Sequence, residues 1–467
     1  MLKFLQVSLI SLFFALPSVA QQVALQRFVS HPCMKYASIG VSVIRLSDGK
    51  EVAAWHPEQA LVPASTLKVL TTATALRRLG ADYRITTTLE YSGVIKDSIL
   101  HGKLFIRGGG DPALGSRYDK RERNAFFEGM LNALRNAGIK QINQELVGDD
   151  RALPEEGVMP GWSWEDLGNY YAAGIYGLNF GDNMFEIVLD TSCKGIQPTV
   201  KSMRPNIPGL KINNRLLPRP TSFDSAYLYG APYASERYLY GAVPQSGSEF
   251  TIKGDLPDPP LQTAQFARDY LVAHGIICKG NAVSAREYDL KGDISEERKV
   301  LWKYYSQPLA EIARQTNVHS LNLYAEGLLR QIAPSAPVAI EQMVRYWKKR
   351  GLDTNGLFIY DGSGLSPSNR LTAGFLSGLM YQMRADEAFV KSLPVAGKEG
   401  TVSSFLKNSA YSGKARLKSG SIKQVVAYTG YIDGKDKYAV SILVNNATCS
   451  SREVRKAIEK LLTEMSL

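Results

Sequence analysis

Segments with strand-like patterns lie near both ends of this 467-residue chain, far apart in the sequence. The first two flank the turn pair Asp48-Gly49, which favours a hairpin. The five segments are residues 37–46, 51–54, 415–422, 425–432 and 438–444. We expect them to share one antiparallel five-stranded sheet with helices on both faces. The fold class is then α+β, with one domain interrupted by the middle of the chain.

Helical patterns accompany these strands at both ends of the chain. Pro63 introduces a helix from about Ser65 to Leu79, and Gly80 ends it. Ser450 and Glu453 form a capping-box signature for a final helix. Further helical patterns cover residues 23–29, 309–315, 320–332, 338–350 and 372–384.

The middle of the chain, residues 83–301, has a different composition. It is rich in Gly, Pro, Tyr and Asn, with short strand-like runs between turn residues. This pattern is typical of β-rich inserted domains with long turns. Since residues 21–467 are too many for one hydrophobic core, we expect two or three domains in total.

The first twenty residues have the pattern of a cleavable signal peptide. Lys3 precedes an apolar run of about a dozen residues, and the small residues Ser18 and Ala20 follow. The run is shorter than the roughly 20 residues that span a bilayer. We therefore expect a signal peptide over residues 1–20 and an exported protein, located in the periplasm or elsewhere outside the cytoplasm.

The formal net charge of +11 does not indicate nucleic-acid binding, because the Lys and Arg residues are scattered and form no single basic stripe. A positive surface on an exported protein favours anionic envelope material. We expect at most peripheral association with membranes.

Four cysteines remain after the signal peptide: Cys33, Cys193, Cys278 and Cys449. None forms a C-x-x-C pair, which argues against a zinc or redox site. Export permits disulfides, and four cysteines allow three pairings. Cys33 precedes the first strand and Cys449 follows the last, so neighbouring strands would bring them together. We predict that bond, with Cys193 and Cys278 left to pair; the alternative is four unpaired thiols.

The strongest local motif is Ser65-x-x-Lys68 in the helix that follows Pro63. Residues three apart share one helix face, so the serine hydroxyl and the lysine amine can meet. A serine hydroxyl needs a nearby base to act as a nucleophile. A lysine can be that base where its pKa is lowered.

Two further motifs follow in the chain: Ser320-Leu321-Asn322, which we expect to open a helix, and Lys418-Ser419-Gly420-Ser421 at a strand end. S-x-x-K with S-D-N and K-T-G motifs is the signature of class A β-lactamases and penicillin-binding proteins. The three segments here follow the same order, with Leu321 and Ser419 as the differences. A Ser-His-Asp site is disfavoured, because no G-x-S-x-G elbow is present.

The chain resembles D-alanyl-D-alanine carboxypeptidases/endopeptidases of the penicillin-binding protein 4 type, the low-molecular-mass class C penicillin-binding proteins. The resemblance covers nearly the whole mature chain and rests on five segments: 63–72, 108–112, 178–183, 322–326 and 361–366.

The resemblance implies a β-lactamase/transpeptidase-like domain split by two inserted domains. The peptidase domain would comprise residues 21–82 and 301–467. Inserted domain II would comprise residues 83–185 and 256–300, and inserted domain III residues 186–255.

The resemblance also implies roles for the motif residues. Ser65 would be the nucleophile, Lys68 its base, and Ser320 a proton carrier. Asn322 would hold the substrate amide and Lys68, and the charge of Lys418 would lower the pKa of Lys68. The substrate would also meet Ser419, Gly420, Ser421 and Leu365, with the Ser65 and Ser421 N–H groups as the oxyanion hole.

Two positions depart from the family pattern. Ser419 stands where threonine is usual, which keeps the hydroxyl and removes a methyl group. Leu321 stands where aspartate or asparagine is common. Neither change removes a reactive group.

The stretch from Trp162 to Tyr170 has two interpretations. It is either a packed aromatic cluster with solvated acids, or a wall of the substrate cleft. In the second case Glu165 or Asp166 would bind the side-chain ammonium of the stem peptide's third residue.

We predict a serine D,D-peptidase that hydrolyses peptidoglycan stem peptides through an acyl-Ser65 intermediate and is acylated by β-lactams. We expect no metal or organic cofactor and no nucleic-acid partner. The alternatives are a serine β-lactamase, which would also have to deacylate rapidly, and a non-catalytic peptidoglycan-binding scaffold.

Overall fold

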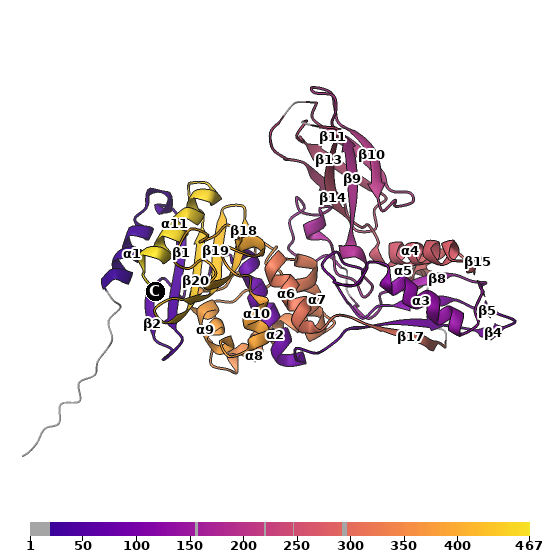
Figure 1. Ribbon diagram of the computed structural model, residues 1–467, viewed down its shortest axis with the longest axis horizontal. Coiled ribbons are helices and arrows are strands. Elements are labelled where there is room, and N and C mark those ends of the chain that lie inside the picture. Colours follow the sequence, from indigo (N-terminus) through magenta and orange to yellow (C-terminus); the bar gives the residue numbers. More distant parts are fainter. Residues whose placement is uncertain (1–18, 155–156, 219–220, 246, 292–296) are drawn as a thin grey trace, which may run out of the picture.

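A computed structural model describes residues 19–154, 157–218, 221–245, 247–291 and 297–467. The two ends of the chain form one five-stranded antiparallel sheet in the order β18-β19-β20-β1-β2 (Figure 1). Its strands are β1 (Ser38–Arg45), β2 (Glu51–Trp55), β18 (Ala415–Ile422), β19 (Val425–Asp433) and β20 (Lys437–Asn445). The α+β fold class and the shared sheet are confirmed.

Alternating side chains of the central strand β20 point to two separate cores. Ala439 and Leu443 pack on one side, and Val440, Ile442 and Val444 on the other. Since successive residues of a strand face opposite sides of the sheet, a strand covered on both faces needs an almost continuous apolar run. This explains why β20 is buried from Tyr438 to Asn445.

Helices cover both faces of this sheet (Figure 1). The larger core joins the sheet to six helices: α2 (Lys68–Leu79), α6 (Leu309–His319), α7 (Asn322–Ile332), α8 (Ala336–Lys348), α9 (Ala373–Met383) and α10 (Glu387–Ser392). The smaller core joins it to α1 (Val19–Val29) and α11 (Ser451–Glu464), which pack against each other. The predicted capping box of α11 is present, with Ser450 and Glu453 bonded reciprocally.

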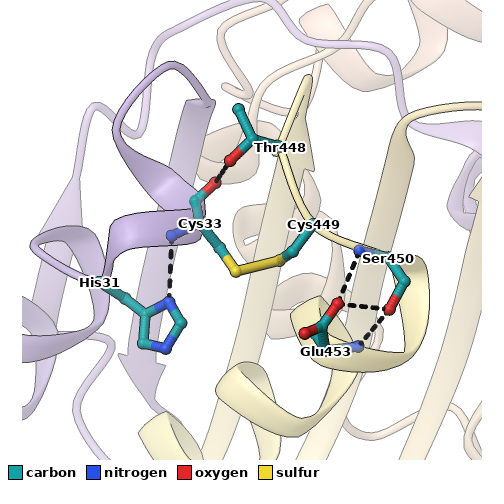
Figure 2. The surroundings of a disulfide bond; sticks show 6 residues. All are labelled: His31, Cys33, Thr448, Cys449, Ser450 and Glu453. Atoms are coloured by element: carbon teal, nitrogen blue, oxygen red, sulfur yellow. Dashed lines mark hydrogen bonds between the residues drawn. A yellow bond between two sulfur atoms is a disulfide. The ribbon is translucent and has the colours of Figure 1, made fainter.

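The disulfide between Cys33 and Cys449 links the two ends of the sheet domain (Figure 2). Cys33 lies in the short 3-10 turn Pro32–Met34 before β1, and Cys449 directly precedes the cap of α11. The Cys33 carbonyl also accepts a hydrogen bond from the Thr448 N–H at 3.1 Å. The predicted bond is therefore confirmed. The predicted Cys193–Cys278 bond is wrong, because both thiols are free: Cys193 is exposed and Cys278 half-buried.

Loss of the Cys33–Cys449 bond should destabilise the sheet domain. The bond closes a span of 416 residues, so the double variant Cys33→Ser/Cys449→Ser should lose about 2–4 kcal/mol of unfolding free energy. Thermal or urea unfolding measures this, and Cys193→Ser/Cys278→Ser is the matched control that should change little. Equal losses in the two double variants would contradict the stapling role.

In the residues that the structure describes, the first inserted region has two sheets and three helices, at the right of Figure 1. The larger sheet has the order β16-β8-β6-β3-β17: β16 (Ala282–Ser284), β8 (Leu146–Asp149), β6 (Leu104–Arg107), β3 (Thr86–Tyr91) and β17 (Lys299–Tyr305). The smaller has the order β15-β7-β5-β4: β15 (Ile277–Cys278), β7 (Gln141–Ile142), β5 (Ile99–His101) and β4 (Val94–Lys96). The helices are α3 (Ala125–Asn136), α4 (Pro259–Ala273) and α5 (Ala285–Lys291).

These helices were not expected from the composition of the middle region. In α3 the buried residues Phe126, Phe127, Met130 and Leu134 nevertheless recur at helical spacing. They pack against the inserted sheet in their own core.

The second inserted region is a pair of three-stranded sheets around a separate small core. One sheet has the order β10-β9-β14: β10 (Thr199–Arg204), β9 (Met184–Asp190) and β14 (Glu249–Asp255). The other has the order β11-β13-β12: β11 (Lys211–Leu216), β13 (Glu236–Gly241) and β12 (Tyr227–Tyr229). The residue boundaries predicted for the domains stay predictions.

Residues 1–18 of the predicted signal peptide lie outside the described residues. Among the residues that the structure describes, no helix has the length and apolarity needed to cross a membrane.

Candidate active site

Ser65 lies in a 3-10 turn, Ala64–Leu67, directly before α2. The sequence placed it in the first turn of an α-helix, but the regular helix begins only at Lys68. Strand β18 passes close to this turn because Gly420 has no side chain: a Cβ there would lie 3.0 Å from the Ser65 backbone nitrogen. The glycine therefore lets the third motif approach the first.

Lys68 is fully buried and contacts three oxygen atoms. Its Nζ lies 2.9 Å from Ser65 Oγ, and 2.6 Å each from Asn322 Oδ1 and the Ser363 carbonyl. The last two oxygens can only accept hydrogen bonds. A neutral amine has two N–H groups for them and one lone pair left for the Ser65 hydroxyl proton. The geometry thus suits an amine that removes a proton from Ser65.

The pKa of Lys68 supports this protonation state. Burial lowers that pKa to about 7, although the nearby carboxyl groups of Asp361 and Glu326 act in the opposite direction. A substantial fraction of the amine is therefore neutral near neutral pH.

The loop that begins at Asp361 holds the Ser363 carbonyl against Lys68. The buried Asp361 carboxylate accepts hydrogen bonds from four donors: Gly364 N, Ser366 N, Asn369 Nδ2 and Trp162 Nε1. Glu326 accepts from the Gly362 N–H with both oxygens, and burial raises its pKa to about 8. Asp361 and Glu326 therefore hold the Ser363 carbonyl oxygen in place. The sequence motifs alone do not identify this oxygen.

Ser320 lies between two helices and does not open one. It ends α6 in the left-handed conformation, with φ of 59°, and α7 begins at Asn322. The prediction that Ser320 starts the helix is therefore wrong by two residues. The unusual backbone angle directs Ser320 toward β18, where its Oγ accepts a hydrogen bond from Lys418 Nζ at 2.9 Å.

Lys418 is buried beside Lys68 and also donates to the Ser419 carbonyl at 2.7 Å. Burial lowers its pKa well below the usual value, and repulsion from Lys68 lowers it further. Burial is the first cause of the lowered pKa of both lysines. The effect of the Lys418 charge on the pKa of Lys68 stays a prediction.

Asn322 connects the motifs to the inserted region. Its Nδ2 donates to the Tyr171 carbonyl at 2.7 Å, while its Oδ1 accepts from Lys68. The Tyr171 hydroxyl in turn donates to Asp166 at 3.1 Å. The segment that contains Asp166 and Tyr171, which precedes the second inserted region, therefore belongs to the site.

A cleft of about 980 Å³ opens over Ser65, Ser320, Asn322 and Ser421. Its walls include the predicted residues Glu165, Asp166, Tyr170 and Leu365, together with Tyr227 and Lys253 of the second inserted region. Trp162 is buried, and its indole donates to Asp361 at 2.9 Å. For Trp162 the contacts favour the packed-aromatic interpretation.

A second hollow of about 470 Å³ adjoins the cleft, and Ser65, Ser320 and Ser421 line both spaces. Ser419 and Gly420 also line the second hollow, together with Thr401 and the basic residues Arg452 and Arg455. The Ser419 hydroxyl donates to Thr401 Oγ1 at 2.7 Å.

Sequence reasoning missed several residues of this site. Thr401, Arg452 and Arg455 reach it from segments with no motif, and Tyr171 contributes a backbone oxygen, which leaves no trace in the sequence. Glu326 could have been found, because it follows Asn322 by one helical turn and shares its helix face.

The chain is similar to a known family over almost its whole length. Residues 21–465 match the model of the D-Ala-D-Ala carboxypeptidase 3 (S13) family. A D-alanyl-D-alanine carboxypeptidase of Actinomadura sp. (strain R39) is 24% identical over an alignment of 447 positions that covers 89% of this chain and 79% of that protein.

Solved structures show the same fold. The crystal structure of penicillin binding protein 4 (dacB) from Haemophilus influenzae has a TM-score of 0.79 at 21% identity, covering 94% of this chain and 97% of that one. The same protein complexed with a β-lactam has a TM-score of 0.74 at 20% identity, covering 95% and 98%.

Proposed function

Because the chain belongs to the D-Ala-D-Ala carboxypeptidase 3 (S13) family, we propose that it hydrolyses peptidoglycan stem peptides through an ester on Ser65. The class of enzyme is a serine D,D-peptidase. The observation that carries the assignment of Ser65 is its 2.9 Å contact with the buried amine of Lys68.

Acylation begins with attack of Ser65 Oγ on the carbonyl carbon of the penultimate D-Ala, while Lys68 takes the hydroxyl proton. Backbone N–H groups of Ser65 and Ser421 stabilise the oxyanion. The C–N bond then breaks, and the leaving amine needs one proton. Ser320, whose Oγ accepts a hydrogen bond from Lys418 at 2.9 Å, supplies that proton and regains the one that Lys68 took from Ser65.

Deacylation uses water in the place of the amine. A base removes one proton from the water, its oxygen attacks the ester carbonyl, and the Ser65 oxygen leaves and regains a proton. Lys68 serves again as the base, so the enzyme returns to its starting protonation state.

The second hollow suits the terminal carboxylate of the substrate. The Ser421 hydroxyl donates to it, the Ser419 hydroxyl does so by turning away from Thr401, and Arg452 and Arg455 add positive charge. The stem peptide then extends from Ser65 in the opposite direction, along the larger cleft and past Leu365.

The acidic wall of the larger cleft suits a cationic side chain. Glu165 and Asp166 line it beside Tyr170, and burial raises the pKa of Asp166. We assign these carboxyl groups to an ammonium on the third residue of the stem peptide.

β-Lactams place a strained amide where the D-Ala-D-Ala bond lies, so they acylate the same serine. The related Haemophilus influenzae structure holds a β-lactam, which supports this proposal. A non-catalytic scaffold would not need a fully buried lysine that is hydrogen-bonded to a serine.

We also propose that the protein acts outside the cytoplasm, in the periplasm or an equivalent compartment. The signal-peptide pattern of residues 1–20 and the Cys33–Cys449 disulfide support this, since such bonds persist in oxidising compartments.

Purified peptidoglycan fragments test the function directly. We expect incubation with pentapeptides to release D-Ala, and crosslinked fragments to separate at the D-Ala–third-residue bond, with products identified by mass. Peptides whose third residue carries an ammonium should be preferred, and Glu165→Gln/Asp166→Asn should reduce that preference.

The matched substrate has the same third residue with its amine acetylated. Absence of any D-Ala release or crosslink cleavage would reject the peptidase assignment. Faster turnover of β-lactams than of D,D-peptides would favour the β-lactamase alternative. If Glu165→Gln/Asp166→Asn leaves the preference for the ammonium-bearing peptide unchanged, only the acidic subsite is rejected and the peptidase assignment stands.

A further inference from the structure

Four tyrosines cover one face of the sheet β11-β13-β12. Strand pairing sets Tyr227 opposite Tyr240 and Tyr229 opposite Tyr238. The residues between them, Leu228 and Leu239, are fully buried in the core behind. Because side chains alternate along a strand, all four rings must share the outer face. We call Tyr227, Tyr229, Tyr238 and Tyr240 the tyrosine face.

Three rings of the tyrosine face are exposed, and Tyr229 is half-buried beside two of them. Tyr227, Tyr238 and Tyr240 retain 45%, 40% and 45% of their accessible surface. The ring centroids of Tyr229 lie 6.3 Å from Tyr227 and 5.8 Å from Tyr240. A contiguous patch of exposed aromatic side chains is more often a binding site than a face that only contacts water.

The tyrosine face is continuous with the catalytic cleft. Tyr227 lines the same cleft as Ser65, but it does not line the hollow that Ser419 and Arg455 line. If the substrate carboxylate lies in that hollow, the amino end of the stem peptide points toward Tyr227. This direction rests on the proposed function.

The covalent structure of peptidoglycan determines which part of the substrate lies near Tyr227. The stem peptide is joined at its amino end to the glycan strand, and about four residues separate that end from the scissile bond. Four extended residues span at most ~14 Å. The sugars must therefore lie near the mouth of the cleft while Ser65 reacts.

The tyrosine face has the groups that sugars need. Aromatic rings offer flat apolar surface to the C–H faces of pyranose rings, and their hydroxyls reach the sugar hydroxyls. Asn213 of β11 lies opposite Tyr238, and the Asn213 amide and the Tyr238 hydroxyl both donate to Glu236; Arg215 lies opposite Tyr240. Tyrosine side chains also lose little conformational entropy when they bind.

We propose that the tyrosine face binds the glycan strand of peptidoglycan, a polymer of N-acetylated amino sugars. The second inserted region then holds the polymer while the sheet domain cleaves the peptide that branches from it. The site is a binding site separate from the catalytic groups.

Binding to peptide-free glycan strands tests the proposal. The probe is fluorescent glycan from which an amidase has removed the stem peptides, and the protein is the full chain with Ser65→Ala. We expect the parent to bind and Tyr238→Thr/Tyr240→Thr to bind at least about tenfold more weakly, since two rings are lost. Threonine retains strand propensity, and neither tyrosine is among the residues that line the cleft.

The matched control removes two exposed tyrosines elsewhere, Tyr36 and Tyr305, which retain 70% and 51% of their surface. Tyr36→Thr/Tyr305→Thr should bind glycan like the parent. With Ser65 present, both double variants should hydrolyse a soluble pentapeptide normally. Only Tyr238→Thr/Tyr240→Thr should lose activity on intact peptidoglycan.

Several results would overturn the glycan site: no glycan binding by the parent, equal binding by both double variants, or binding of an oligonucleotide or a protein in place of glycan. Loss of pentapeptide hydrolysis in Tyr238→Thr/Tyr240→Thr would also overturn it, because the residues would then act on the cleft. Failure of the parent to hydrolyse any D,D-peptide would reject the proposed function and leave the glycan measurement standing.

Discussion

Replacement of Ser65 by alanine is expected to abolish both peptide hydrolysis and acylation by a fluorescent penicillin. The physical reason is that the covalent step needs an oxygen 2.9 Å from Lys68 Nζ, and alanine has none. The loss should be the largest of any single substitution. Gel fluorescence and D-Ala release measure the two reactions separately.

The control for Ser65→Ala is Ser163→Ala. Ser163 lines the same cleft but belongs to none of the three motifs. Ser163→Ala should retain labelling and hydrolysis. The thermal unfolding temperature of Ser65→Ala should remain close to that of the parent. Penicillin labelling of folded Ser65→Ala would show that another residue is the nucleophile.

Replacement of Lys68 is expected to reduce acylation by about 10² or more, the usual contribution of a general base. Lys68→Arg should be as inactive as Lys68→Ala, because a guanidinium keeps the charge but does not release its proton. Lys418→Arg should lose much less, since Lys418 acts through its charge and its bond to Ser320. Stopped-flow acylation rates distinguish the two roles.

The pH dependence follows from the same amine. Burial lowers the pKa of Lys68 to about 7, and only the neutral form can accept the Ser65 proton. The acylation rate should therefore rise with pH between about 6 and 8 and then level off. Because burial is the main cause, Lys418→Arg should leave this rise near pH 7. An acylation rate independent of pH across this range would contradict Lys68 as the base.

The contacts among the three motifs were predictable from the sequence. Serine and lysine three residues apart can meet, and the resemblance to the family implied that Lys418 joins them. Lys418 lies within β18 (Ala415–Ile422) and not at the strand end that was expected. The pairing of β1 with β20 followed from the strand patterns at the two ends, and with it the Cys33–Cys449 bond. These features depend on local spacing and on strand order, which the sequence contains.

Other features depend on tertiary contacts and were not predictable. The left-handed conformation of Ser320 is held by its neighbours: the Leu321 N–H bonds to the Thr316 carbonyl, and α7 starts afresh after it. The hydrogen-bond donors to Asp361 come from two segments that are distant in the sequence, and one of these segments contains Trp162. A motif shows which side chains are present, but it does not show which backbone oxygen faces them.

The position of β1 in the sheet has a consequence for how the molecule is made. Its hydrogen-bonding partner β20 lies almost at the other end of the chain, and the two cysteines beside them are 416 positions apart. At roughly 5–20 residues per second, β1 leaves the ribosome ~20–80 s before β20 exists. The inserted regions have their own cores and can fold during that interval. The reactive serine meets Lys418 only when synthesis is nearly finished, so an unfinished chain carries no active hydrolase.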